Sequence, residues 1–252
     1  MCGFTGFLGG LAEDDLVLRR MADRLIKLGY RADRIDVIAN GYDLSVFPLT
    51  SELKKRTRQE LGISGDLLVI GIVGRFDELK DYENFVRAAA YIAILRPPVR
   101  FIMVGRGVDA SNSQLMGWIN RDPRSDRFIL LGERADVTSL MAAMNVYCLS
   151  STAEGFPNVV VEAMAKQVPC VVTNIGDAAR IVRDTGQVVP PRDSLALANA
   201  LIDMVDLPRD QREALGVRAR KVVESNYAID TVAQQYFNLY SSLIQTPQAN
   251  ST

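Results

Sequence analysis

Residues 145–173 read NVYCLSSTAEGFPNVVVEAMAKQVPCVVT, in which two short β-branched runs enclose a polar loop and an apolar segment of helical length. The runs NVYCLS at 145 and PCVVT at 169 predict strands, and the segment between them predicts a helix. A strand, a crossover helix and a second strand in this order are typical of a parallel sheet. The stretch therefore predicts a βαβ unit.

The same alternation extends over most of the chain. Further β-branched runs are IDVIA at 35, LLVIGIV at 67, VRFIMVG at 99 and RFILLG at 127, and helical patterns of ten or more residues separate them. We expect an α/β fold with a doubly wound parallel sheet, in which ligands bind beyond the carboxyl ends of the strands. The loops GRFDELK, GRG, GERAD, SSTAEGFP and NIGD follow these runs and are the expected binding segments.

Helical patterns prevail at both ends of the chain. Residues 11–28 carry an apolar face and end at Gly29, a glycine stop, and after residue 186 the pattern predicts helices over 194–205, 209–223 and 229–244. The last of these carries a wide apolar stripe from Ile229 to Leu243 that requires a partner surface. We divide the chain into an N-terminal segment of uncertain meaning (1–10), a helix and linker (11–33), an α/β domain (34–245) and a tail (246–252).

Composition narrows the classes of function. The net charge is −1, from 29 basic and 30 acidic residues, which gives no electrostatic footprint for nucleic acid. The chain has no histidine, and Cys2, Cys148 and Cys170 form no C-x-x-C pair, so we expect neither a metal site nor histidine catalysis. We interpret Cys148 and Cys170 as buried strand residues. Because no apolar run reaches the ~18 residues of a membrane span, we expect a cytoplasmic protein, with a peripheral position at the inner membrane face left open.

Two glutamates flank the Gly-Phe-Pro turn of the opening stretch. Glu154 lies in the loop, whereas Glu162 lies in an almost purely apolar segment, where an unpaired carboxylate costs several kcal/mol. Pro157 suits the first helical position, and Glu162 lies about 7.5 Å further along that helix. We therefore expect the two carboxylates to hold different parts of one extended ligand, with a phosphate at the helix start and vicinal hydroxyls on a carboxylate. The plain alternatives are a solvated loop acid and a helix residue turned to water.

Residues 154–165, EGFPNVVVEAMA, resemble the Glu-x7-Glu motif of the retaining glycosyltransferases of family four. The resemblance runs from about Arg34 to the final helix, through VIANGYDLSVF at 37, VGRFDELKDYENFVRAA at 73, FIMVGRG at 101, LLGERADVTSLMAAMNVYCLSS at 130 and GQVVPPRDSLALANAL at 186. It implies the Rossmann-like, C-terminal donor-binding half of a GT-B architecture.

The resemblance also implies roles for individual residues. Glu162 would bind the ribose diol of the donor, Glu154 the transferred sugar, and Arg75 and Lys80 the diphosphate, so Glu154, Arg75 and Lys80 are the candidate catalytic residues. The other candidate donor-binding residues are Gly155, Phe156, Pro157, Asn158, Gly74, Gly105 and Arg134. Gly105 and Gly107 are equally consistent with a tight turn alone. The chain departs from the family at Asp81 and Gln167, where glycine is usual, and at Gly176-Asp177, where two glycines are usual.

Two cations at the leaving diphosphate stabilise its growing charge, so no metal and no cofactor is expected. The donor would be a UDP-sugar or GDP-sugar carrying a hexose-type sugar, transferred with retention by front-face attack to a glycan, a lipid or a small molecule. Since the resemblance covers only the second domain, we expect the chain alone to bind nucleotide-sugar without transfer, and its final stripe to drive self-association or pairing with a separate acceptor-domain chain.

Two other interpretations stay open. One is a non-catalytic nucleotide-sugar-binding or partner-scaffolding module, and the other is a sugar-nucleotide epimerase of the same fold. The opening MCGFTGF is similar to the start of class II glutamine amidotransferases. Nothing else of that family appears, so we expect no catalytic role for Cys2.

Overall fold

The computed structural model describes residues 25–31, 36–65, 67–96 and 99–245. Residues 1–24, with Cys2 and the segment 1–10, and the tail 246–252 lie outside the described residues. The chain forms two compact units, residues 47–221 and residues 1–46 with 222–252, and each is described by itself. The predicted boundary at residue 34 stays a prediction.

Residues 47–221 contain a six-stranded parallel sheet in the order β3-β2-β1-β4-β5-β6. Its strands are β1 (Leu68–Val73), β2 (Val99–Val104), β3 (Phe128–Leu130), β4 (Val146–Leu149), β5 (Cys170–Thr173) and β6 (Gln187–Val189). The direction of winding reverses between β1 and β4, and loops at such a switch point splay apart and leave room for a ligand. The doubly wound α/β fold is confirmed.

Two strand assignments differ from the sequence prediction. The described part of the run at 35, residues 36–39, forms no strand, so that prediction was wrong. Its β-branched residues lack a paired neighbour, and this part of the chain reaches only an isolated bridge between Tyr42 and Ala228. Conversely, Gln187–Val189 pairs in parallel with β5, although we had assigned helices after residue 186. A strand of three residues is too short for a periodic pattern to show.

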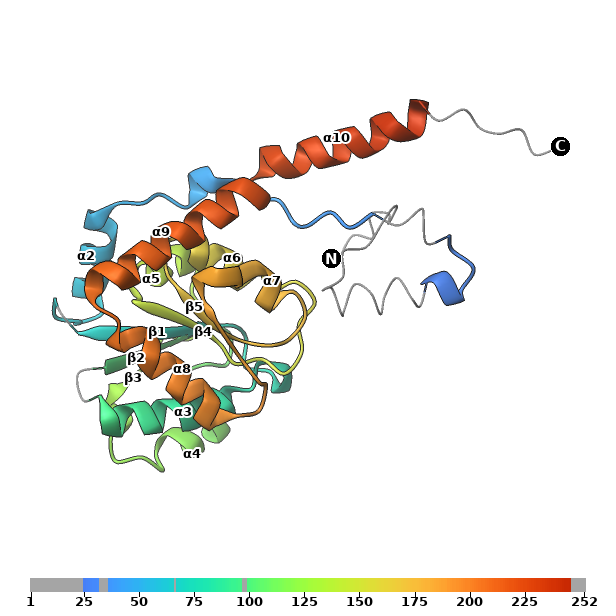
Figure 1. Ribbon diagram of the computed structural model, residues 1–252. Coiled ribbons are helices and arrows are strands. Elements are labelled where there is room, and N and C mark those ends of the chain that lie inside the picture. The colour runs from blue at the N-terminus through green and yellow to red at the C-terminus, as the bar shows by residue number, and fades with distance from the viewer. Residues whose placement is uncertain (1–24, 32–35, 66, 97–98, 246–252) are drawn as a thin grey trace. The chain divides into compact units, whose positions relative to one another are not determined.

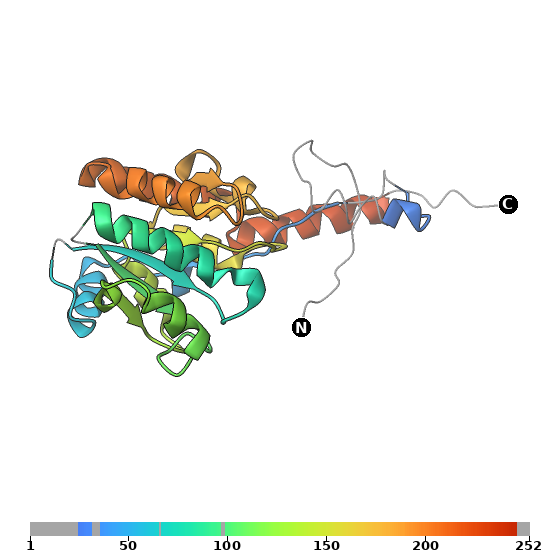
Figure 2. The same cartoon turned by 90° about the horizontal axis from the view of Figure 1, so that it is seen from below.

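Helices cover both faces of the sheet (Figure 1). One face carries α3 (Tyr82–Leu95), α4 (Ser113–Ile119) and α8 (Ser194–Asp206), and Figure 2 shows α3 and α8 side by side. The other carries α5 (Val137–Ala143), α6 (Asn158–Ala165) and α7 (Ala178–Val182), with α2 (Ser51–Glu60) packed on α5. Short 3-10 turns are η2 (Leu44–Val46), η3 (Glu78–Lys80), η4 (Ser125–Arg127) and η5 (Arg183–Thr185).

The core lies between the strands and these helices. Phe101 of β2 stacks on Phe128 at a centroid distance of 5.1 Å and meets Phe85 of α3 edge-on at 6.2 Å. Cys148 and Cys170 are free and fully buried on neighbouring strands, which confirms their interpretation as core residues. Burial raises the pKa of both thiols, so neither is a ready nucleophile.

Three helices after β6 were predicted closely. Besides α8, they are α9 (Arg209–Asn226), which passes from one unit into the other, and α10 (Ile229–Gln245). In the unit of residues 1–46 and 222–252, residues 25–27 are helical and Gly29 has a φ of +95°, as a glycine stop requires.

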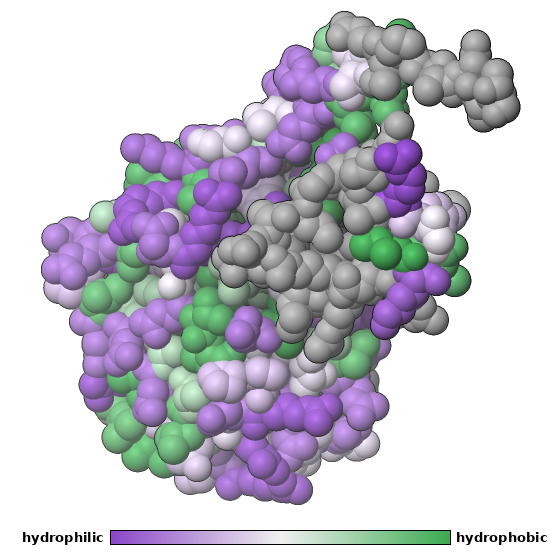
Figure 3. Space-filling model, turned by 45° about the vertical axis from the view of Figure 1, so that its right-hand side comes forward, coloured by the Kyte–Doolittle hydropathy of each residue, from purple (hydrophilic) through white to green (hydrophobic). Residues whose placement is uncertain are grey.

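Helix α10 carries the predicted apolar stripe. Val232 is buried, whereas Ile229, Tyr240 and Leu243 are exposed, and Figure 3 shows hydrophobic side chains along the helix that leads to the grey tail. The self-association of this surface stays a prediction. Among the helices of the described ranges, none combines the length and apolar character that a membrane span needs.

Candidate functional site

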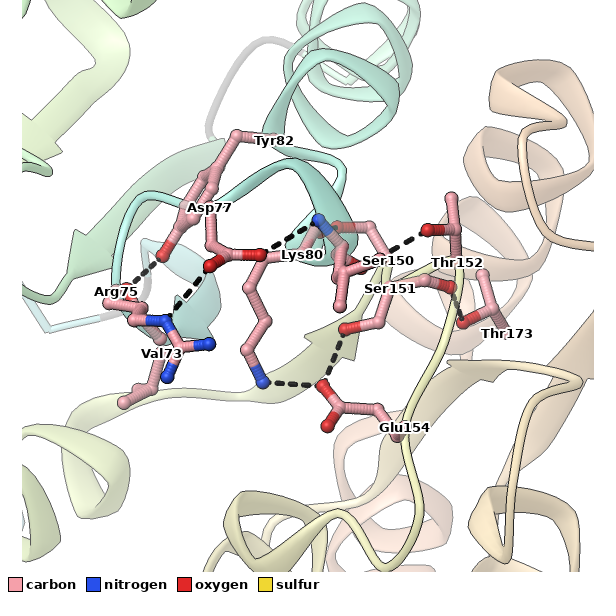
Figure 4. Close-up of polar contacts among 12 residues, drawn as sticks. Val73, Arg75, Asp77, Lys80, Tyr82, Ser150, Ser151, Thr152, Glu154 and Thr173 are labelled. Atoms are coloured by element: carbon pink, nitrogen blue, oxygen red, sulfur yellow. Dashed lines mark hydrogen bonds and ion pairs between the residues drawn. The ribbon is translucent and has the colours of Figure 1, made fainter. Parts of the chain in front are cut away.

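The loops after β1 and β4 meet through a charged pair at the carboxyl edge of the sheet. The Lys80 ammonium, at the end of η3, forms an ion pair with Oε1 of Glu154 (Figure 4). The hydroxyl of Ser151 donates to the same Oε1 atom at 2.9 Å. The side chains of Lys80 and Glu154 are only 20% and 16% exposed, so solvent screens the pair weakly. The structure thus brings together two of the three candidate catalytic residues.

Three hydroxyl residues directly after β4 fasten these loops to one another. Ser150 Oγ donates to the Lys80 carbonyl at 2.8 Å, and the Thr152 amide donates to the Leu79 carbonyl at 2.8 Å. The carbonyl of Ser151 accepts from Thr173 Oγ1 at 2.7 Å, which ties the loop to the end of β5. Sequence reasoning missed this group, although three consecutive hydroxyl residues at a strand end were the available signal.

Arg75 follows the same strand as Lys80 but has a different partner. Its Nε donates to Asp77 Oδ2 at 3.0 Å, and the side chain is 58% exposed. Asp77 also caps η3 by accepting from the Leu79 amide, and this bond, followed by the one from Arg75, lowers the pKa of the Asp77 carboxyl. Asp77 therefore holds the exposed side chain of Arg75 beside η3 in the loop after β1.

Gly74 and Gly105 stand where two loops touch. Gly74 donates to Val104 at 2.9 Å and its carbonyl accepts from the Tyr82 hydroxyl, while Gly105 donates to Gly132 at 2.8 Å. A Cβ on Gly105 would lie 1.8 Å from the Gly74 carbonyl oxygen, and Gly105 has a φ of +149°. The Val108 amide also bonds to the Gly105 carbonyl at 3.0 Å, so this glycine closes a tight turn. The close approach of the two loops therefore explains why glycine is needed at position 105.

The segment 154–158 leads into α6, whose start corrects one prediction. The helix begins at Asn158 and Pro157 is its N-cap, one residue earlier than the first helical position that we had assigned to it. Pro157 has a ψ of +88°, outside the helical range, yet its carbonyl accepts from the Val160 amide at 3.0 Å. Gly155 and Asn158 are exposed and Phe156 is half-buried, and the Gly155 carbonyl accepts from the Asp177 amide at 3.0 Å.

Glu162 differs from Glu154 in its surroundings. It lies on α6 among buried apolar residues, and burial raises the pKa of its carboxyl above the ordinary value of 4.5. Within the described part of the chain, its side chain forms neither a hydrogen bond nor an ion pair. An uncompensated, half-buried carboxylate on a helix that starts in the loop is a position prepared for an external hydrogen-bond donor.

This position yields a first prediction. Because the folded chain holds the Glu162 proton more tightly than the unfolded chain, ionisation lowers folding stability as the pH rises through the folded pKa. The cost is absent below the unfolded pKa and complete above the folded one. Glu162→Gln should therefore raise the ligand-free melting temperature at neutral pH and leave it nearly unchanged at acid pH. Thermal unfolding at both pH values measures this, and a lower melting temperature at neutral pH would contradict it.

Arg134 has a partner in its own loop. Its Nε and Nη2 each donate to a carboxylate oxygen of Asp136 at 2.8 Å, in the loop after β3. Strand β3 is at the sheet edge, three places from β4. Among the described residues, no hydrogen bond or ion pair joins Arg134 to Lys80 or Glu154, and its role in donor binding stays a prediction.

Two residues that replace a usual glycine lie in the left-handed backbone region. Asp81 and Gln167, which stand where glycine is usual, have φ values of +48° and +58°. A residue with a Cβ costs about 1–2 kcal/mol in this left-handed region. Asp81 offsets part of the cost by capping α3, since its side chain accepts from the Asn84 amide at 3.2 Å.

The described residues contain no group of three or more His, Cys, Asp or Glu side chains placed to hold a metal ion. The strand order, the glycine-containing loops and the acid-bearing helix together define a doubly wound α/β domain, a class in which ligands bind at the carboxyl edge of the sheet. Residues 68–206 match the family model described as glycosyl transferases group 1. The chain belongs to this family.

Curated relatives agree with this membership. The chain is 31% identical over 182 residues to UDP-Gal:alpha-D-GlcNAc-diphosphoundecaprenol alpha-1,3-galactosyltransferase of Escherichia coli, covering 69% of this chain and 46% of the relative. It is 30% identical over 225 residues to D-inositol 3-phosphate glycosyltransferase of Corynebacterium urealyticum, covering 85% and 53%. The chain thus spans about half the length of these relatives.

Solved structures show the same fold. The chain superposes on Anabaena HepE in complex with UDP-glucose with a TM-score of 0.77 and 27% identity, covering 89% of this chain and 62% of HepE. The lipopolysaccharide glycosyltransferase WaaG shares the fold with a TM-score of 0.73 at 19% identity, covering 86% and 59%. These likenesses confirm a C-terminal domain of GT-B type.

Proposed function

We propose that this domain binds a nucleoside diphosphate sugar and holds it for transfer of a hexose-type sugar to an acceptor, with retention and without a metal ion. Glu162 accepts hydrogen bonds from the ribose diol, Glu154 faces the transferred sugar, and Lys80 with Arg75 holds the diphosphate. Gly155, Phe156 and the first turn of α6 line the path between the two carboxylates.

The observation that carries the proposal is the contrast between the two glutamates. Glu154 is already held by Lys80 and Ser151, whereas Glu162 has no partner in the described chain and a raised pKa. A donor molecule supplies the missing groups, because ribose hydroxyls donate to carboxylates and a diphosphate attracts an ammonium. The likeness to HepE, a protein solved with UDP-glucose, supports a UDP-sugar, and a GDP-sugar is the second candidate.

The positive charges of Lys80 and Arg75 explain how these side chains would act in sugar transfer. The departing nucleoside diphosphate gains negative charge, and Lys80 and Arg75 stabilise it without a metal. In a front-face reaction the leaving phosphate takes the acceptor proton, which fits a chain without histidine. Glu154, as the ion-pair partner of Lys80, keeps the ammonium at the donor edge until the diphosphate competes for it.

The acceptor and the setting belong to the same proposal. The names of the relatives include a diphosphoundecaprenol-linked acceptor and an inositol phosphate, so a lipid, a glycan and a small molecule all stay open. We place the reaction in the cytoplasm, with a peripheral position at the membrane if the acceptor is a lipid. An acceptor-binding domain would form the other wall of the cleft.

Calorimetry on two variants tests whether Glu162 and Glu154 bind different parts of the donor. Glu162→Ala should weaken the binding of UDP by about 1.5–3 kcal/mol, because a hydrogen-bonded charge is lost at the ribose. Glu154→Ala should leave the affinity for UDP nearly unchanged and weaken only the binding of the UDP-sugar. Equal losses for both variants with UDP alone would refute the separate roles, and a panel of nucleotide-sugars then identifies the base and the sugar.

Metal independence gives a further prediction. Nucleotide binding should be the same in excess EDTA and in added Mg²⁺, since two cationic side chains, rather than a carboxylate-bound ion, supply the countercharge. The measurement is a UDP titration under both conditions. A large fall of affinity in EDTA that Mg²⁺ restores would require a bridging metal and contradict this part of the proposal.

A further inference from the structure

A cavity of about 350 Å³ lies on the other side of the same unit from the donor loops. Its walls include the N-cap Thr50 with Ser51 and Lys54 of α2, Asn145 before β4, Lys166–Pro169 before β5, and Arg212 and Glu213 of α9. Because all strands are parallel, residues that precede them lie at the edge opposite to residues that follow them. The cavity is therefore separate from the Lys80–Glu154 pair. We call it the rear cavity.

Positive charge predominates around the rear cavity. Lys54, Lys166 and Arg212 line it, against the single carboxylate of Glu213. That carboxylate is engaged elsewhere, since its Oε1 accepts from Arg209 Nε at 2.8 Å. The cavity therefore contains more positive than negative charge.

Two of the three cations are buried and fixed by the main chain. Lys166 is 5% exposed and its Nζ donates to the Pro48 carbonyl at 2.8 Å. Arg212 is 7% exposed, and its Nη1 donates to the carbonyls of Val205 and Leu207, each at 2.9 Å. Carbonyl oxygens accept the hydrogen bonds of these side chains but do not neutralise a full positive charge. A bound anion would therefore stabilise both cations.

Lys54 is the third cation and the most available one. In the described chain its ammonium forms neither a hydrogen bond nor an ion pair. Burial lowers its pKa, and the positive charges of Arg58, Arg209 and Arg212 lower it further, while Glu213 opposes them. Burial also lowers the pKa values of Lys166 and Arg212. Positive charges that lie near one another with only one nearby carboxylate repel each other, and a bound anion reduces this repulsion.

We propose that the rear cavity binds a phosphate group, with Lys54 and Arg212 as its cationic ligands and Lys166 as a further positive charge in its wall. A phosphate carries close to two negative charges and several acceptor oxygen atoms, so it suits a cavity with more than one cation better than a single carboxylate does. The hydroxyl of Ser51 and the start of α2, a helix of ten residues, add donors on the same wall. The phosphate belongs either to a soluble phosphorylated compound or to a lipid headgroup.

The test first removes phosphate binding at the donor edge. In the Arg75→Gln/Lys80→Gln chain, inorganic phosphate is titrated against an equal ionic strength of chloride and binding is followed by amide NMR shifts. We expect saturable binding, weakened at least about tenfold by Lys54→Gln and unchanged by Lys221→Gln, which removes an exposed lysine of α9. Because the donor cations are absent in every sample, the result is independent of the proposed function.

A second arm distinguishes the two sources of phosphate. The same chains are sedimented with phosphatidylcholine vesicles that contain or lack phosphatidic acid. Binding of inorganic phosphate that depends on Lys54 supports the site and a soluble ligand, and Lys54-dependent binding to phosphatidic acid vesicles alone supports the site and a headgroup. Binding to neither probe, or equal binding by the Lys54→Gln chain, would overturn the proposal. Unchanged circular dichroism of Lys54→Gln confirms that the variant is folded.

Discussion

Replacing Lys80 by methionine should slow sugar transfer by about 10²–10³-fold, the loss found when one preorganised donor to a developing negative charge is removed. The Lys80 ammonium is paired with Glu154 at the donor edge and would face the leaving diphosphate. Methionine keeps the aliphatic stem that packs over Gly74, so the variant removes mainly charge. The measurement is release of nucleoside diphosphate by the protein that combines this domain with an acceptor-binding domain.

Lys55 provides the matched control. It is an exposed lysine of α2, and α2 packs against α5 far from the donor loops in the fold, so Lys55→Met should change transfer by no more than about twofold. A Lys80→Met enzyme that works within tenfold of the unchanged one would show that the diphosphate is held elsewhere. An unchanged affinity for UDP together with slow transfer would place the whole effect in the transition state.

Replacing Gly105 by alanine should lower the free energy of unfolding by roughly 3–5 kcal/mol, from backbone strain and overpacking together. The added Cβ would lie 1.8 Å from the Gly74 carbonyl oxygen at a φ of +149°. Neither backbone can withdraw easily, because Gly74 bonds to Val104 and Tyr82 while Gly105 bonds to Gly132. Urea unfolding followed by circular dichroism measures the change.

Gly117 separates this effect from the general cost of replacing a glycine. It lies in α4 with no heavy atom within 4 Å of an added Cβ, so Gly117→Ala should raise the free energy of unfolding by about 0.5–1 kcal/mol. A Gly105→Ala chain as stable as the unchanged one would mean that the loops after β1 and β2 separate at little cost. The close approach would then not hold the donor loops in place.

The strands that are buried on both faces could be predicted from the sequence. The runs in β1, β2, β4 and β5 are continuous and β-branched because helices cover both sides, and that pattern does not depend on knowing their neighbours. The run at 35 has the same local character, but residues 36–39 form no strand. Local propensity was equal in both cases, and only pairing with a neighbour decided between them.

Part of the candidate site was also accessible from sequence. Glu154, Glu162, Arg75 and Lys80 were placed correctly on the loops and the helix that follow β1 and β4, because a motif fixes positions along the chain. The supporting hydroxyls of Ser150, Ser151 and Thr152 were not identified. The partner of Ser150, the Lys80 carbonyl, lies 70 residues away in sequence, and only the fold brings the two together. Arg134 was grouped with these residues by its loop, but its printed partner is Asp136 in the same loop, so its part in the site stays a prediction.

The fold class, the family and the chain positions of two carboxylates and two cations could all be predicted before folding was considered, because periodicity and motif spacing are local properties of the chain. Which of these charged groups lie close enough to interact is visible only in the folded chain. Glu154 lies against Lys80, Glu162 is left without a partner, and Lys54, Lys166 and Arg212 gather around one cavity. The physical reason is that electrostatic energy depends on distance and burial, and both are set by how the strands are ordered in the sheet.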